Sequence, residues 1–209
     1  MADAILSEGA VADANGYGLL QTINIFEAED RTFEKWAASA ANPYTYGTIN
    51  RQTLLAHGNR ARIPLPEVIH YYQDAWITGF WNVYRFARVI LLQTLARLTM
   101  RVSLYPELAP MTTRMDRVRE KVFREVDTMV NDICASIPYT LGKVDAGGWI
   151  TRNPEKSLSN KAISGYTSVW PLRLALMVGT PTDSQKRYIF DQLAYIEGSM
   201  GIKQAKLNV

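Results

Sequence analysis

The stretch that decides the fold runs from Glu67 to Val102 and reads EVIHYYQDAWITGFWNVYRFARVILLQTLARLTMRV. It contains no proline and a single glycine, Gly79, and prolines at positions 66 and 106 flank it. Its apolar residues recur every three or four positions, as on one face of a helix: Ile69, Tyr72, Trp76, Phe80, Val83, Ala87, Leu91, Leu95 and Leu98. The middle is apolar almost all round, which indicates a helix covered on every side. We therefore expect one central helix over residues 67–102, roughly 54 Å long.

Other segments of the chain also have helical spacing. The pattern predicts helices over residues 19–40, 114–136, 162–178 and 182–200. We expect Pro138 and Gly142 to end the second of these, and a capping box of Thr182 and Gln185 to begin the last, which Gly201 would stop.

The segments between these helices carry no regular pattern. The connector up to Pro66 lacks periodicity, and no stretch of the chain predicts a β-strand. The predicted fold class is all-α, an irregular helical bundle packed around the central helix. Residues 1–18 are expected to form a mobile leader, and residues 19–209 a single all-helical domain.

Composition argues against several classes of protein. The 209 residues are 47% hydrophobic and 21% charged, as in an ordinary globular domain. The net charge of +3 is small, and the basic residues between Arg114 and Arg124 alternate with acids, so we expect no direct contact with nucleic acid. Cys134 is the only cysteine, which excludes an intramolecular disulfide and a cysteine-rich zinc site.

The same features bear on localisation. Asn82, Arg85 and Arg88 interrupt the apolar part of the central helix, so we expect no membrane span. Acidic residues before Gly16 break any hydrophobic run of a targeting signal. We therefore expect an intracellular protein, in the cytoplasm or the nucleus.

The standard catalytic signatures are missing from the sequence, which contains no phosphate loop, dinucleotide fingerprint, paired-histidine metal motif or nucleophile elbow. We expect no metal and no cofactor. Aromatic and polar side chains are instead concentrated on the central helix. Trp81 and Arg85 are spaced to stack on one helix face, and a buried Arg85 would need a partner such as Asp127 or Asp132.

Two interpretations of this concentration stay open. It is either a large core with internally satisfied polar groups or a lipophilic pocket with a few orienting donors. Trp170 and Arg173, beside the proline at position 171, repeat the combination of aromatic and cationic side chains.

Five pieces of the sequence resemble the C-terminal half of the fungal-specific transcription factor domain. They are FEAEDRTFEKWAASAANPYTY (26–46), WNVYRFARVILLQTLARL (81–98), VNDICASIPYTLG (130–142), GYTSVWPLRLALMVGTP (165–181) and IEGSMGIKQA (196–205). In that family the helical regulatory region follows a zinc binuclear-cluster module that binds DNA, and it is thought to sense metabolites. Two departures matter, because the six-cysteine cluster and the N-terminal half of the helical domain have no counterpart here.

Two classes of function follow. In the first, the protein binds a hydrophobic small molecule in natural-product metabolism, and the enzyme activity that such a pocket would allow is that of a cofactor-free cyclase or isomerase. The catalytic candidates are then His70, Tyr72, Tyr84 and Arg85. The substrate-binding candidates are Tyr71, Trp76, Trp81, Asn82, Arg88, Trp170 and Arg173. In the second, it is a co-regulator or regulatory fragment, unable to bind DNA, that acts through helix-mediated dimerisation, for instance as a homodimer. An enclosed cavity favours the first class, and a filled core with an apolar outer patch favours the second.

Overall fold

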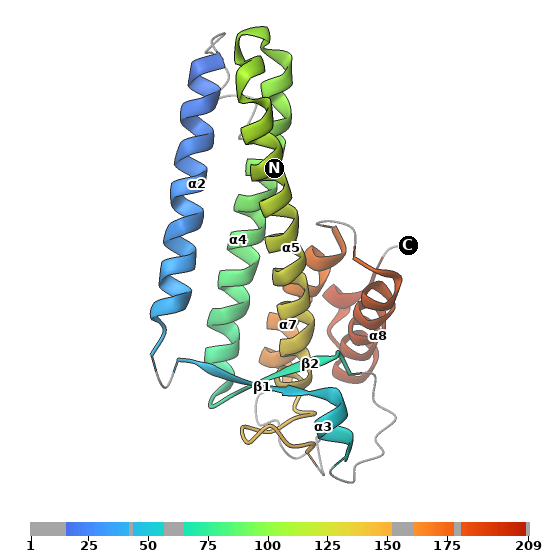
Figure 1. The fold of residues 1–209 in the computed structure, drawn as a ribbon. Helices are drawn as coiled ribbons and strands as arrows, with labels where there is room; N and C mark the ends of the chain where they lie inside the picture. Colours follow the sequence, from blue (N-terminus) through green and yellow to red (C-terminus); the bar gives the residue numbers. More distant parts are fainter. Residues whose placement is uncertain (1–15, 42–43, 57–64, 152–160, 178–180, 208–209) are drawn as a thin grey trace. The chain divides into compact units, whose positions relative to one another are not determined.

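The computed structural model describes residues 16–41, 44–56, 65–151, 161–177 and 181–207. Its architecture is mostly helical, as expected (Figure 1). In chain order the elements are α2 (Gly16–Ser39), β1 (Tyr46–Asn50), α3 (Arg51–Ala56), β2 (Val68–Tyr72), α4 (Ala75–Arg101), η1 (Val102–Leu104), η2 (Pro106–Met111), α5 (Thr112–Thr140), α7 (Lys161–Met177), α8 (Asp183–Met200) and η3 (Lys203–Ala205). None of the helices in the described ranges combines the length and the apolar character that a bilayer crossing requires.

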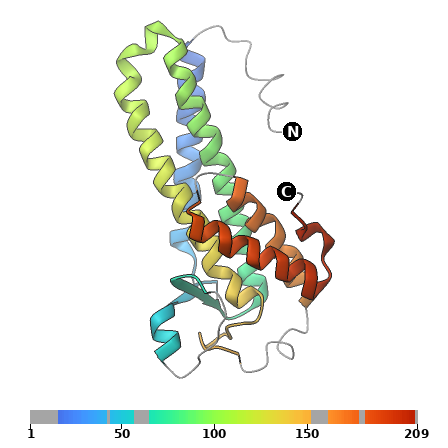
Figure 2. The same ribbon diagram turned by 90° about the vertical axis from the view of Figure 1, so that its right-hand side faces the viewer.

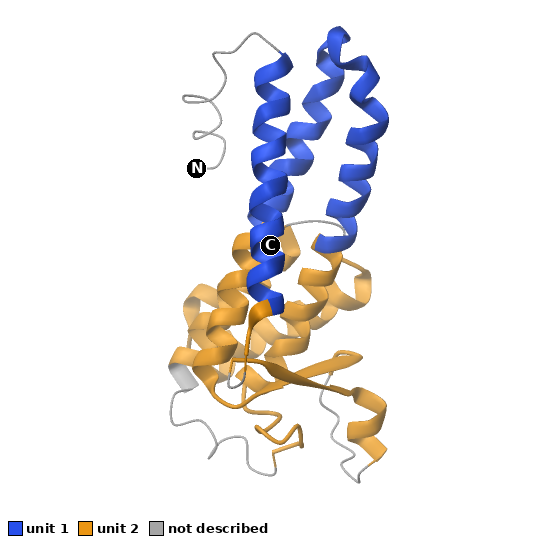
Figure 3. Cartoon of the chain, turned by 60° about the vertical axis from the view of Figure 1, so that its left-hand side comes forward, with its two compact units in different colours: residues 1–38, 90–125 blue, residues 39–89, 126–209 orange. Residues whose placement is uncertain are grey.

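The chain divides into two compact units (Figure 3). Unit 1 comprises Met1–Ala38 and Ile90–Glu125, and unit 2 comprises Ser39–Val89 and Val126–Val209. The long helices α4 and α5 are each divided, with one segment in unit 1 and the other in unit 2.

Unit 1 contains α2 and the adjoining segments of α4 and α5. Apolar side chains from all three are buried, namely Ile23, Leu92, Leu95, Leu98, Met115 and Val122. Ion pairs also join α2 to α5, because Lys121 reaches both Asp30 and Glu34.

Unit 2 contains the other segments of α4 and α5, the small sheet, α7 and α8. The helices α7 and α8 lie side by side (Figure 2). Buried residues here include Val89, Ile133, Ile137, Leu172, Ile189, Leu193 and Ile196. A smaller apolar cluster of Leu54, Leu65, Ile69 and Val144 lies beside the sheet, with Ile49, Tyr71 and Ile150 packed against it.

The start of the central helix was predicted wrongly. Residues 68–72 form β2, which pairs antiparallel with β1, and the prediction that the chain has no strand is wrong as well. The sequence VIHYY is rich in β-branched and aromatic residues, which suit a strand with one partner. The helix α4 starts at Ala75, where the Oδ1 of Asp74 accepts a hydrogen bond from the backbone N–H of Trp76 at 2.8 Å.

The ends of the other helices follow the expected rules, with one exception. Thr182 and Gln185 form the predicted capping box of α8, and Gly201 closes that helix with φ of 72°. Pro138, however, lies inside α5, which continues to Thr140 and ends just before Gly142, a glycine with φ of 67°. Residues 1–15 of the expected leader lie outside the described residues, while Gly16–Gly18 belong to α2. The division into a leader and one domain stays a prediction.

The central helix is not covered on every side. Trp76, Phe80 and Val83 of α4 are 70%, 60% and 67% exposed. The expectation from apolar composition is therefore wrong for this face, because composition alone does not say which neighbours a helix has.

Candidate functional site

A buried polar cluster surrounds Arg85 in unit 2. The Arg85 side chain is fully buried, and its Nη1 donates hydrogen bonds of 3.0 Å to both the hydroxyl of Tyr72 and the Oδ1 of Asn82. Its Nη2 lies 3.2 Å from the Nδ1 of His70. Its Nε has no hydrogen bond and lies 3.8 Å from the Oδ2 of Asp132. The guanidinium thus joins β2, α4 and α5.

The partners of Arg85 have second partners of their own. The hydroxyl of Ser136 shares its proton between the Oδ1 of Asn82 at 3.1 Å and the backbone carbonyl of Ile133 at 2.8 Å, and the hydroxyl of Tyr72 lies 3.4 Å from the Nδ1 of His70. Such closed networks hold segments in one register, since each buried polar group is satisfied only in that arrangement. We call Tyr46, His70, Tyr72, Trp81, Asn82, Arg85, Asp132 and Ser136 the Arg85 cluster.

Electrostatics keep His70 neutral. Burial, and next the positive charge of Arg85, lower the pKa of His70 to about 3. Arg85 donates to Nδ1, so the ring proton is on Nε2, which lies 3.7 Å from the Oδ1 of Asp132. At that distance the carboxylate orients the ring, but it does not offset burial and Arg85.

Burial raises the pKa values of Tyr72 and Asp132, the opposite of its effect on His70. Burial raises the pKa of Tyr72 to about 12, although Arg85 opposes it, so the phenol stays protonated. Burial also raises the pKa of Asp132, and Arg85 is the group that lowers it. Arg85 is thus the cation of the cluster, Asp132 is its carboxyl group, and the remaining members act as neutral dipoles.

Aromatic rings lie against one side of the guanidinium. The carbon Cζ of Arg85 lies 5.2 Å from the ring centroid of Tyr46 and 5.7 Å from that of Trp81. Tyr46 also contacts the rings of His70 and Tyr72, at centroid distances of 4.4 and 5.3 Å. The indole N–H of Trp81 donates to the backbone carbonyl of Tyr44 at 2.8 Å. The rings of Tyr46 and Trp81 are themselves only 4.9 Å apart, so both cover the guanidinium from the same side.

The structure brings together several of the candidates from the sequence. His70, Tyr72, Trp81, Asn82 and Arg85 meet in the cluster, although His70 and Tyr72 come from β2 rather than from the central helix. Next to them, Arg88 donates to the hydroxyl of Tyr84 at 3.2 Å, and the ring of Tyr84 lies 5.5 Å from that of Trp81.

Four candidates lie elsewhere. Tyr71 alternates to the other face of β2, where its ring covers Gly47 and Gly148. Trp76 on α4 and Trp170 on α7 are mostly exposed. Arg173 donates to the backbone carbonyl of Lys206 near the C-terminal end.

Sequence reasoning missed Tyr46 and Ser136. Tyr46 lies in the connector without periodicity, and only its pairing with Tyr72 across the sheet brings it to Arg85. Ser136 is three residues past Ile133 on the apolar face of α5, and a lone serine there gives no signal. Asp132, one of two suggested partners of Arg85, is the one that pairs with it, whereas Asp127 accepts a hydrogen bond from Asn131.

The polar groups of the cluster are paired with one another, apart from the Nε of Arg85. Within the described part of the chain, no group of three or more histidine, cysteine, aspartate or glutamate side chains could hold a metal ion. Burial raises the pKa of Cys134 to about 12, so this cysteine is a buried thiol rather than a nucleophile.

Comparison with known proteins gives one informative relative. The chain is 29% identical over 145 residues to "Transcription factor dbaG" of Emericella nidulans. The match covers 68% of this chain and 32% of the relative, so the chain spans about a third of that protein's length. No family model matches the chain, and no solved structure matches it. The similarity supports a relation to a region of a fungal transcription factor, and it supports no finer assignment.

Proposed function

We propose that this chain is a regulatory helical module that works as a homodimer through the exposed apolar face of α4. The distant similarity to a fungal transcription factor supports a regulator-related role. Dimerisation and the assignment to the C-terminal half of the fungal-specific domain go beyond that similarity. A role of this kind suits a protein of the nucleus or the cytoplasm.

The observation that carries the proposal is the arrangement of side chains around α4. At about 100° per residue, Trp81, Asn82 and Arg88 lie within about 60° of Arg85 on the helical wheel. Trp76, Phe80 and Val83 lie on the opposite side, within about 40° of the antipode. The helix therefore directs polar groups inward and large apolar groups outward. We call Trp76, Phe80 and Val83 the outer face of α4.

The outer face suits another helix. Its members are spaced four and three residues apart, which is the spacing of anchors that a helix presents to a partner. A Cβ added at Gly79, between Trp76 and Phe80, would meet no atom within 4 Å, so no other segment of the described residues covers this position. A face without charged side chains is self-complementary, as a twofold interface between two copies requires.

The test is native mass spectrometry combined with sedimentation velocity of the full chain. We expect a dimer that dissociates in the variant Trp76→Gln/Phe80→Gln without loss of the free energy of unfolding, since both side chains are exposed. The matched control is Phe123→Gln on α5 of unit 1, which replaces a side chain that is 66% exposed. A monomer at all concentrations, or a dimer that the double variant retains, refutes the proposal.

The same spectra report on the second candidate function, the binding of a hydrophobic metabolite by the aromatic residues around Arg85. Its support is that Arg85 Nε and Thr78 Oγ1 are buried without a hydrogen bond, and so have donor capacity left for a ligand. A monomer that retains a small molecule from a lipophilic extract, and loses it in Arg85→Met, favours this function. Cofactor-free cyclisation or isomerisation by His70, Tyr72, Tyr84 and Arg85 would then become the next assay.

A further inference from the structure

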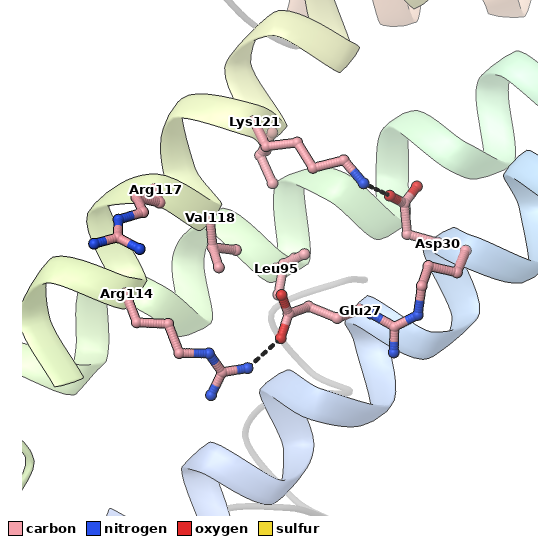
Figure 4. A pocket seen from close by; sticks show the side chains of 9 residues that line it. Glu27, Asp30, Leu95, Arg114, Arg117, Val118 and Lys121 are labelled. Atoms are coloured by element: carbon pink, nitrogen blue, oxygen red, sulfur yellow. Dashed lines mark hydrogen bonds and ion pairs between the residues drawn. The ribbon is translucent and has the colours of Figure 1, made fainter.

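A pocket in unit 1 lies between α2, α4 and α5, and none of its lining residues belongs to the Arg85 cluster or to the outer face of α4. Its volume is about 210 Å³. Figure 4 shows its side chains, with Arg114 reaching Glu27 and Lys121 reaching Asp30 across the opening. The lining residues are Glu27, Asp30, Arg31, Leu95, Arg114, Arg117, Val118, Lys121 and Val122.

The base of the pocket is apolar. Leu95 and Val122 are each 2% exposed, and Val118 is half-buried. An aliphatic or aromatic group placed against them would bury its own surface and theirs, which is the main source of affinity for small ligands. A cavity of about 150 Å³ is enough for benzene, so this pocket accommodates a body of one ring or a short branched chain together with a polar group.

The charges around the opening are not balanced. Four cationic side chains face two carboxylates of the lining, and Glu34, which accepts from Lys121 at 3.1 Å, adds a third. One positive charge therefore remains in excess. The carboxylates already have partners, because Arg114 binds Glu27 and Lys121 binds Asp30 and Glu34.

Two arginines of the lining have no carboxylate partner. Among the described residues, neither Arg31 of α2 nor Arg117 of α5 has an ion pair or a side-chain hydrogen bond with another residue. A guanidinium binds a carboxylate through two parallel hydrogen bonds, so each is equipped for that group. One excess charge suits a monoanion better than a phosphate dianion.

We propose that this pocket binds a small monocarboxylic acid with a compact apolar body. The carboxylate contacts Arg31 or Arg117, and the body lies against Leu95, Val118 and Val122. This inference goes beyond the proposed dimerisation and is independent of it, because every residue that it uses belongs to unit 1.

The experiment is isothermal titration of the full chain with three probes. Phenylacetate has both the charge and an apolar body, phenylacetamide lacks the charge, and acetate lacks the body. We expect phenylacetate to bind more tightly than either of the others, and its affinity to fall with added salt because the contacts at the opening are solvent-exposed.

Variants locate the site. We expect one of Arg31→Gln and Arg117→Gln, whichever removes the guanidinium that contacts the carboxylate, to weaken phenylacetate binding by about fivefold to tenfold, as for loss of a charge-assisted hydrogen bond at an exposed site. The matched control Lys35→Gln removes an exposed cation one turn further along α2, outside the pocket, and should bind as the unchanged protein does.

Three results would overturn the proposal. The first is that phenylacetate does not bind even at tens of millimolar. The second is that phenylacetamide or acetate binds as tightly as phenylacetate. The third is that Arg31→Gln, Arg117→Gln and Lys35→Gln all lower the affinity for phenylacetate to the same extent. Competition by inorganic phosphate at equal strength would also overturn it, because it would make the site a general anion site without a role for the apolar base.

Discussion

Replacing Arg85 with methionine tests whether the Arg85 cluster stabilises the fold through its charge. The change keeps most of the side-chain volume and removes the guanidinium. Tyr72 and His70 still contact each other, and Asn82 still accepts from Ser136. Asp132 alone then lacks its cation. A buried charge pair that loses one partner costs about 3–5 kcal/mol, and since the side chain of Asp132 is 26% exposed, we expect about 2–4 kcal/mol for Arg85→Met.

A double-mutant cycle with Asp132→Asn isolates the pair. At 3.8 Å and an effective dielectric constant of about 20, the attraction is about 4 kcal/mol, and the exposure of Asp132 reduces it to about 1–2 kcal/mol of coupling. Because the pKa of Asp132 is raised even beside Arg85, we expect Asp132→Asn to change the free energy of unfolding of the unchanged protein by less than about 0.5 kcal/mol and to stabilise Arg85→Met by about 1–2 kcal/mol. The assay is urea unfolding followed by circular dichroism, with equal m-values required across the set.

The pH dependence gives an independent check. Burial raises the pKa of Asp132, and loss of Arg85 removes the group that lowers it. If the pKa of Asp132 is raised in the folded state, its protonated carboxyl group stabilises the fold at low pH, and this contribution is lost as pH rises through that pKa. The difference between Arg85→Met and the double variant should therefore be small near pH 4 and largest near pH 7. Additive effects in the cycle, or a loss below about 0.5 kcal/mol in Arg85→Met, would refute the reasoning.

Two further predictions concern neighbouring groups. The pKa of His70 is lowered from 6.5 to about 3, so folding favours the neutral ring. Below pH 6.5 the free energy of unfolding should therefore fall by up to about 1.4 kcal/mol per pH unit. Urea titrations should show a smaller fall for His70→Gln, which has no imidazole to protonate. Gly47→Ala should destabilise by about 1–3 kcal/mol, because a Cβ there would lie 2.1 Å from Cζ of Tyr71. Its control in thermal unfolding is Gly198→Ala in α8, where a Cβ meets no atom within 4 Å; equal losses would contradict the steric reason.

The parts of the fold that local rules govern were predictable from sequence. The capping box of Thr182 and Gln185 and the stop at Gly201 depend only on neighbouring residues, and both are confirmed. The partner of Arg85 was narrowed to two aspartates, because a buried cation requires an anion and few lie on the facing helix.

The parts that depend on distant partners were not predictable. In VIHYY, Ile69 and Tyr72 also fit helical spacing, and the segment is a strand because Tyr46–Asn50, far earlier in the chain, pairs with it. The role of Tyr46 follows from the same pairing. The outer face of α4 was taken for core, since an apolar stripe has the same spacing whether its own chain covers it or not.

The polar core and the outer face of α4 are connected by geometry. Apolar side chains allow a helix to rotate about its axis at little cost, whereas hydrogen bonds require one orientation. Arg85 is bound at once to β2, through His70 and Tyr72, and to α5, through Asp132. We infer that these bonds fix the rotation of α4, and that this rotation is what directs Trp76, Phe80 and Val83 outward. The buried arginine is then a positioning residue for the proposed dimer interface, although it lies on the opposite side of the helix.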